Sequence, residues 1–183
     1  MKIRTIVLWT TILVIIDQIV KIIVNSYFLE SRFDIIPSLF EFRPTFNTKH
    51  SYVNVLLSQY FDINIGLLPH IFLFLLIVIG SFIFYGYFRN SNLRYKRLLD
   101  FEFVFLLASI ICAFSGNLVW EKGTINYIYL KPLFIFYLKD LYNNCFVVLF
   151  YIFTFKNKTE FRKMKLNDVV LYIKNDVFKS EKQ

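Results

Sequence analysis

The chain has 183 residues, of which 57% are hydrophobic and 19% charged, with a formal net charge of +8 and a mean hydropathy of +0.53. This composition excludes an ordinary soluble domain of similar length and indicates a membrane protein with several spans. The basic residues lie beside the apolar segments, so we expect them to face anionic lipid headgroups and predict no nucleic-acid partner.

Four segments are long and apolar enough to form membrane-spanning helices, which need about 20 residues each. They cover about residues 5–25, 67–88, 101–120 and 132–155. We therefore predict an all-α membrane protein with four transmembrane helices, in which residues 1–155 form one domain and residues 156–183 a basic cytoplasmic tail. Pro132 fits the first turn of the last helix, where its missing N–H is harmless.

The segment between the first and second spans alternates apolar and polar residues, as in Phe40–Arg43, and is predicted to be a small β-containing extracytoplasmic segment. Lys and Arg are more frequent before the first span, between the second and third, and after the fourth. Because positively charged loops stay in the cytoplasm, both termini are expected to be cytoplasmic.

Asp140 places a carboxylate inside the fourth apolar segment, about eight residues from its start. An ionisable group at that depth is costly unless it faces a cavity or a partner, so Asp140 is interpreted as a functional residue. Lys139 is adjacent in sequence and should point about a third of a turn away, so we expect no ion pair between the two side chains.

Other polar residues lie near the ends of the predicted spans. Asp17 and Lys21 are four residues apart and can pair on one face of the first helix, either as a structural ion pair or as a contact to substrate. Gly116 allows a neighbouring segment to approach closely, and Asn117 offers both a donor and an acceptor. Asn47 lies in the extracytoplasmic segment. Cys112, Cys145, His50 and His70 show no metal-ligand spacing, so no metal or cofactor is predicted.

In chain order these residues resemble the motifs of signal peptidase II, the intramembrane aspartic endopeptidase that trims prolipoproteins before a lipid-modified cysteine. The resemblance covers about residues 6–155 and rests on four short segments, which are Asp17-Gln18-x-x-Lys21, the stretch ending at Asn47, Gly116-Asn117 and Phe136-Tyr137-Leu138-Lys139-Asp140. It implies that Asp140 is one of two catalytic aspartates, that the partner is a lipid-modified membrane protein, and that the protein resides in the bacterial inner membrane.

The sequence departs from the family at the second catalytic position, where Asn126 replaces an aspartate. Asparagine has nearly the same shape but cannot exchange a proton at neutral pH. General acid–base catalysis contributes about 10²–10⁴-fold, so an Asp/Asn pair should be nearly inactive. Glu121 is a candidate substitute carboxylate, and Tyr137 stands where the family has asparagine.

Three functions are therefore open. The first is a divergent endopeptidase, and the second is a catalytically impaired relative that binds or regulates lipidated clients. A small transporter or channel subunit would use the same charges as an ion path, but the sequence shows no internal repeat and no ion-site spacing. An aspartic-type site requires the side chains of Asp140 and Asn126 to approach within about a water's width.

Overall fold

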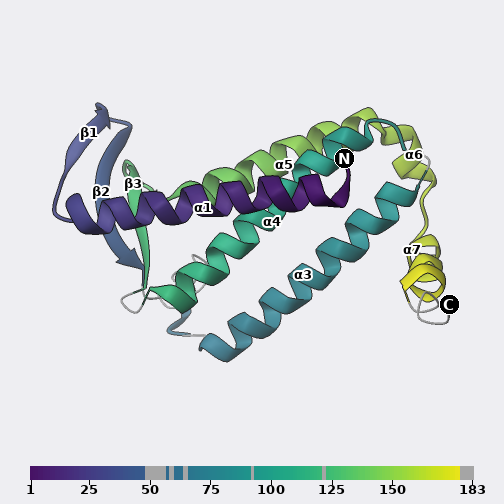
Figure 1. The fold of residues 1–183 in the computed structure, drawn as a ribbon, viewed down its shortest axis with the longest axis horizontal. Helices are drawn as coiled ribbons and strands as arrows, with labels where there is room; N and C mark the ends of the chain where they lie inside the picture. Colours follow the sequence, from purple (N-terminus) through teal and green to yellow (C-terminus); the bar gives the residue numbers. More distant parts are fainter. Residues whose placement is uncertain (48–56, 58–59, 64–65, 92, 121–122, 178–183) are drawn as a thin grey trace.

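The computed structural model describes residues 1–47, 57, 60–63, 66–91, 93–120 and 123–177. Long helices form the body of the molecule, with a sheet at one end and short helices at the other (Figure 1). The helices whose bounds fall within these residues are α1 (Ile3–Tyr27), α3 (Leu67–Asn90), α4 (Lys96–Val119), α5 (Leu138–Lys156), α6 (Lys158–Lys163) and α7 (Leu166–Tyr172), followed by the π-helical turn η1 (Ile173–Val177).

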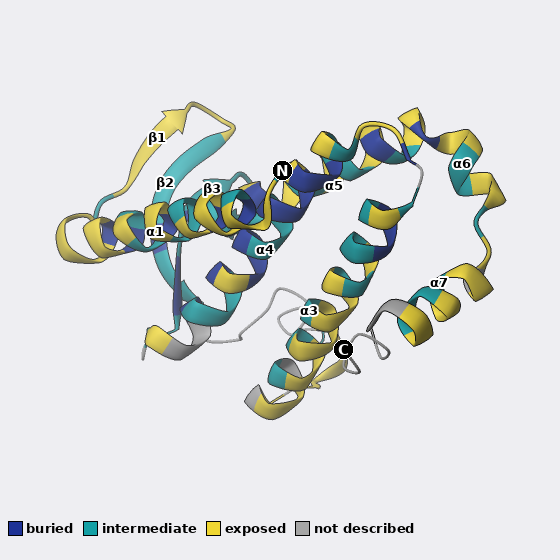
Figure 2. Cartoon of the chain, turned by 45° about the vertical axis from the view of Figure 1, so that its right-hand side comes forward, coloured by how far each residue is buried: buried dark blue, intermediate teal, exposed yellow. Residues whose placement is uncertain are grey.

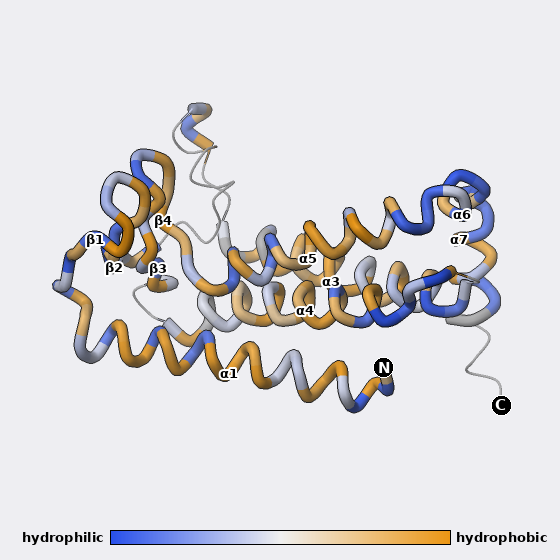
Figure 3. The backbone as a smooth tube through the Cα atoms, turned by 90° about the horizontal axis from the view of Figure 1, so that it is seen from above, coloured by the Kyte–Doolittle hydropathy of each residue, from blue (hydrophilic) through white to orange (hydrophobic). Residues whose placement is uncertain are grey.

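Among the described residues, three helices are long and apolar enough to cross a membrane, within α1, α3 and α4. The first three predicted spans are thereby confirmed as helices of suitable length and hydropathy. Their apolar side chains are largely exposed on α1 and α3, as a lipid-facing surface requires (Figures 2 and 3). α5 does not meet the same criterion, so a fourth crossing stays a prediction.

The prediction for the start of the fourth helix is wrong. Pro132 lies in the turn 131–133, and α5 begins at Leu138. The apolar run before the helix forms strand β4 (Phe134–Phe136), which pairs with β3 (Thr124–Leu130). Aromatic and β-branched residues fit a pleated strand as well as a helix, and the pairing with β3 decides between the two.

The sheet has four antiparallel strands in the order β1-β2-β3-β4. β1 (Phe33–Ile36) and β2 (Phe40–Asn47) come from the connection between α1 and α3, where strands were predicted. β3 and β4 come from the connection between α4 and α5, where none was predicted. Pairing of β2 with β3 therefore joins two connections that are distant in the sequence.

α4 is the central helix, since both α1 and α5 pack along it, and α3 packs less closely. Ala108 and Cys112 of α4 are fully buried against Tyr142 of α5. At the sheet end, Val24 of α1 packs with Ile125 of β3. These two apolar clusters fix where α1, α4, α5 and the sheet meet, which is also where the polar residues of interest gather.

Candidate functional site

Asp17 and Lys21 form the ion pair that their spacing predicted. Lys21 Nζ lies 2.7 Å from Asp17 Oδ2, and both side chains are completely buried. Because neither charge reaches the surface, the pair stabilises the packing of α1 rather than presenting a charge to solvent. This geometry favours the structural interpretation of the pair over direct contact with a substrate.

Gln18 connects this pair to the end of α4. Its Nε2 donates to Asp17 Oδ2 and to Ser115 Oγ, each at 3.1 Å, and its Oε1 accepts a hydrogen bond from Trp120 Nε1 at 3.4 Å. Ser115 and Trp120 were not predicted as site residues. They lie about 100 positions from Gln18 in the chain, and no local pattern reports such a pairing.

The ring of Tyr137 is close to two ammonium groups. Lys21 Nζ is 4.1 Å from the centroid of the Tyr137 ring, and Lys139 Nζ is 4.9 Å from it. Such contacts are attractive because the face of an aromatic ring is negative. Tyr137, which is almost fully buried, thus links the ion pair of α1 to the start of α5.

Asp140 occupies the first turn of α5 and caps it. Its Oδ2 accepts the Tyr137 backbone N–H at 3.2 Å, and its Oδ1 lies 2.9 Å from Lys139 Nζ. The prediction that Lys139 and Asp140 do not pair is wrong, because the long lysine stem reaches its neighbour. The expected depth of Asp140 is also wrong, since the helix begins only two residues earlier. A carboxylate is favourable at a helix N-terminus even where it has no other role.

Asn126 lies on β3 beside the segment that leads into α5. Its Nδ2 donates to the backbone oxygen of Ile135 at 3.2 Å, while its buried Oδ1 has no hydrogen-bond partner among the described residues. The last β3–β4 pair is Ile128 with Phe136, so Asn126 is two residues beyond it towards the start of α5. On the same strand, burial raises the pKa of Tyr127, whose phenol therefore stays neutral.

Asn47 and Gly116 meet at Thr124 of β3. Asn47 is paired with Thr124 across the sheet, and a Cβ added to Gly116 would lie only 2.6 Å from Thr124 Oγ1. The close approach predicted for Gly116 is therefore present. Asn117 follows it in α4, but its side chain and the whole of Glu121 lie outside the described part of the chain.

The described residues contain no group of three or more His, Cys, Asp or Glu side chains that could hold a metal ion. What they do contain is a chain of contacts from Asp17 through Lys21, Tyr137 and Lys139 to Asp140. In this chain only the side chains of Lys139 and Asp140 are appreciably exposed, at 26% and 34%. This pair is therefore the part of the chain of contacts that an incoming molecule can reach.

Two solved structures that are similar in fold are each described as a bacterial membrane enzyme structure determined by the in meso method. The one at 1.9 Å resolution has a TM-score of 0.61 and 20% identity, and the match covers 82% of this chain and 92% of that one. The one at 2.3 Å has a TM-score of 0.63 and 19% identity, covering 90% and 96%. The chain has the fold of these membrane enzymes. No family model and no curated protein matches its sequence.

Proposed function

We propose that the protein is a divergent, signal peptidase II-like intramembrane aspartic endopeptidase. It cuts membrane-bound prolipoproteins before the lipid-modified cysteine, in the bacterial inner membrane, with both termini in the cytoplasm. The observation that carries this proposal is the gathering of four motif segments, distant in sequence, at the sheet end of the bundle. These are Asp17–Lys21, Asn47, Gly116 and Tyr137–Asp140.

Asp140 acts as the catalytic base in this proposal. Its carboxylate takes a proton from a water molecule while the water oxygen attacks the scissile carbonyl carbon. The C–N bond then breaks, and the proton passes to the leaving nitrogen, which departs as an amine. Lys139 must first release Asp140 Oδ1, and its partial exposure makes this exchange with substrate or water inexpensive. Glu121 is the proposed second carboxyl group, which protonates the carbonyl oxygen as the water attacks and takes that proton back when the C–N bond breaks.

One observation favours a second candidate, a catalytically impaired relative that binds or regulates lipidated clients. Asn126 stands where the family has its second aspartate, and its Nδ2 is already committed to Ile135 O. An amide in that place keeps the shape of the site but supplies no titrating proton. In this case the site retains the lipidated segment of a client without hydrolysing it.

The two candidates are distinguished by reconstituting the full chain in liposomes with a lipid-modified prolipoprotein and following its size on gels. The endopeptidase cleaves, and Asp140→Asn lowers the rate by at least about 10²-fold because the base is lost. Asp168→Asn is the matched control, since Asp168 caps α7 in the way Asp140 caps α5. Cleavage should be unchanged in that variant.

Two further variants identify the second carboxyl group. If Glu121 supplies it, Glu121→Gln also abolishes cleavage. If the protein retains the prolipoprotein but cleaves none at any protein concentration, the endopeptidase proposal fails. Cleavage that appears only in Asn126→Asp would then establish the impaired relative. A protein that neither cleaves nor retains the lipidated client overturns both candidates.

A further inference from the structure

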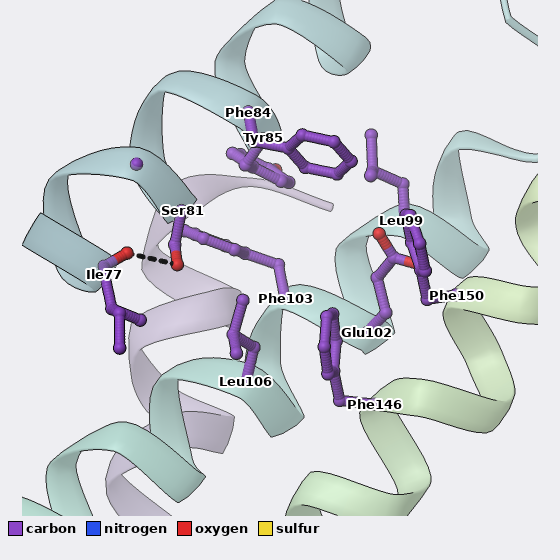
Figure 4. Close-up of a pocket in the computed structure, with 11 residues that line it drawn as sticks. Ile77, Ser81, Phe84, Tyr85, Leu99, Glu102, Phe103, Leu106, Phe146 and Phe150 are labelled. Atoms are coloured by element: carbon purple, nitrogen blue, oxygen red, sulfur yellow. Dashed lines mark hydrogen bonds between the residues drawn. The ribbon is translucent and has the colours of Figure 1, made fainter. Parts of the chain in front are cut away.

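A cavity of about 410 Å³ opens between α3, α4 and α5 (Figure 4). The segments that line it lie in the half of the bundle away from the sheet (Figure 1). On α5, Phe146 and Phe150 of its wall are six and ten residues beyond Asp140, or about 9 and 15 Å at 1.5 Å per residue. The cavity is thus separate from the site described above. Five of the eleven residues that line it are aromatic, namely Phe84, Tyr85, Phe103, Phe146 and Phe150.

Glu102 places a carboxylate in this aromatic wall. The residue is only 2% exposed, and its Oε2 has no hydrogen-bond partner among the described residues. Figure 4 shows the carboxylate lying between Leu99 and the rings of Phe146 and Phe150. A buried carboxylate without a partner is unfavourable by several kcal/mol, so the position calls for a group that compensates it.

The neighbouring polar groups do not serve Glu102, because they are engaged elsewhere. Arg89 Nη1 lies 3.1 Å from Asp100 Oδ2, and Tyr85 OH donates to Asp100 Oδ1 at 2.8 Å. Ser81 Oγ, which also lines the cavity, donates to Ile77 O within its own helix. Asp100, two residues before Glu102, is therefore fully compensated, whereas Glu102 is not.

The aromatic residues of the wall, like the carboxylate, are compatible with a cationic ligand. The rings of Tyr85 and Phe103 are stacked at 4.1 Å, and those of Phe84 and Phe150 lie 5.6 Å apart. Aromatic faces assembled around a space attract ammonium groups, as in cages for quaternary amines. The volume falls within the range of small-molecule sites. α3 and α4 are both apolar enough to cross a membrane, so a ligand reaches the cavity from the lipid phase.

We propose that this cavity binds the ammonium headgroup of an amphiphilic lipid, with Glu102 as counter-ion and the aromatic rings around the charge. The apolar tail leaves between α3 and α5 into the bilayer. This site is independent of the endopeptidase proposal, since it uses none of the same residues.

Dodecylammonium and dodecanol, which share one tail and differ in charge, are suitable probes for the purified full chain in neutral maltoside micelles at pH 7. Dodecylammonium should raise the melting temperature in a saturable manner and be retained as a one-to-one adduct in native mass spectrometry. Dodecanol should do neither. Glu102→Gln, which keeps the shape but removes the charge, should weaken dodecylammonium binding at least tenfold, while Glu160→Gln on α6 should leave it unchanged.

Phe150→Leu is a second variant for the same binding measurements, and it leaves the carboxylate in place. It should weaken binding of dodecylammonium several-fold by removing one ring of the cage. If Glu102→Gln does not fold, this variant alone tests whether the cavity binds the ammonium group. The proposal is overturned if dodecanol stabilises the protein as strongly as dodecylammonium. It is equally overturned if the folded Glu102→Gln or Phe150→Leu variant binds dodecylammonium as tightly as the unaltered protein.

Discussion

Lys21→Met removes one member of the buried ion pair and leaves the other in place. The methionine side chain fills nearly the same volume, so the change is mainly electrostatic. Asp17 would then keep the amide of Gln18, 3.1 Å from Oδ2, and the neighbouring thiol of Cys112, in place of the ammonium at 2.7 Å. Its Oδ1 already has no hydrogen-bond partner among the described residues.

The expected cost follows from the complete burial of both side chains. Breaking a buried ion pair from one side costs about 3–5 kcal/mol, because an uncompensated charge remains. Loss of the contact between Lys21 and the Tyr137 ring, worth about 0.5–2 kcal/mol, is part of that total. In the double variant Asp17→Leu/Lys21→Met neither charge of this pair is left. It should therefore recover at least half of the free energy of unfolding that Lys21→Met loses.

The free energy of unfolding can be measured by titrating dodecyl sulfate into maltoside micelles and following near-ultraviolet circular dichroism. Lys163→Met is the control, since Lys163 is exposed on α6 and its loss should change stability by less than about 0.5 kcal/mol. The reasoning is refuted if Lys21→Met costs less than about 1 kcal/mol. It is also refuted if the double variant is no more stable than Lys21→Met.

Two more predictions concern the sheet end. Gly116→Ala should lower the free energy of unfolding by about 1–3 kcal/mol, because its Cβ would meet Thr124 Oγ1 at 2.6 Å; adding Thr124→Ala should restore most of this. Gly80→Ala, with nothing within 4 Å of the new Cβ, is the control, and an equal loss there would contradict the steric argument. A hydrogen bond to Asp34, assisted by Glu41, raises the pKa of Lys131 above 10.5. The protein should therefore melt at a higher temperature than Lys131→Met. This difference should have its full size below pH 10.5 and disappear as the pH rises through the raised pKa of Lys131. A difference that persists at still higher pH would exclude the ion pair as its source.

The helices α1, α3 and α4 could be predicted from the sequence because hydropathy over about 20 residues is a local property. The pairing of Asp17 with Lys21 was predictable for the same reason, since helical geometry brings residues four apart together. The close approach at Gly116 was anticipated from the absence of a side chain, although its partner, Thr124, was not.

The second half of the sheet could not be predicted in this way. The run Leu133–Phe136 is as compatible with the start of an apolar helix as with a strand, and only its pairing with β3 distinguishes them. Placing the helix start too early put Asp140 too deep and hid its capping role. The contacts of Gln18 with Ser115 and Trp120 were missed because they depend on how α1 packs against α4.

The pairing of β2 with β3 has a consequence for biosynthesis. When the ribosome has delivered β1 and β2, the second partner of β2 does not yet exist, because β3 follows only after α3 and α4 have been made. Until then β2 has an open edge, which is the kind of edge that promotes mispairing between chains. Completion of the sheet is thus a late event, and it locks the first and last long helices together only when most of the polypeptide has emerged.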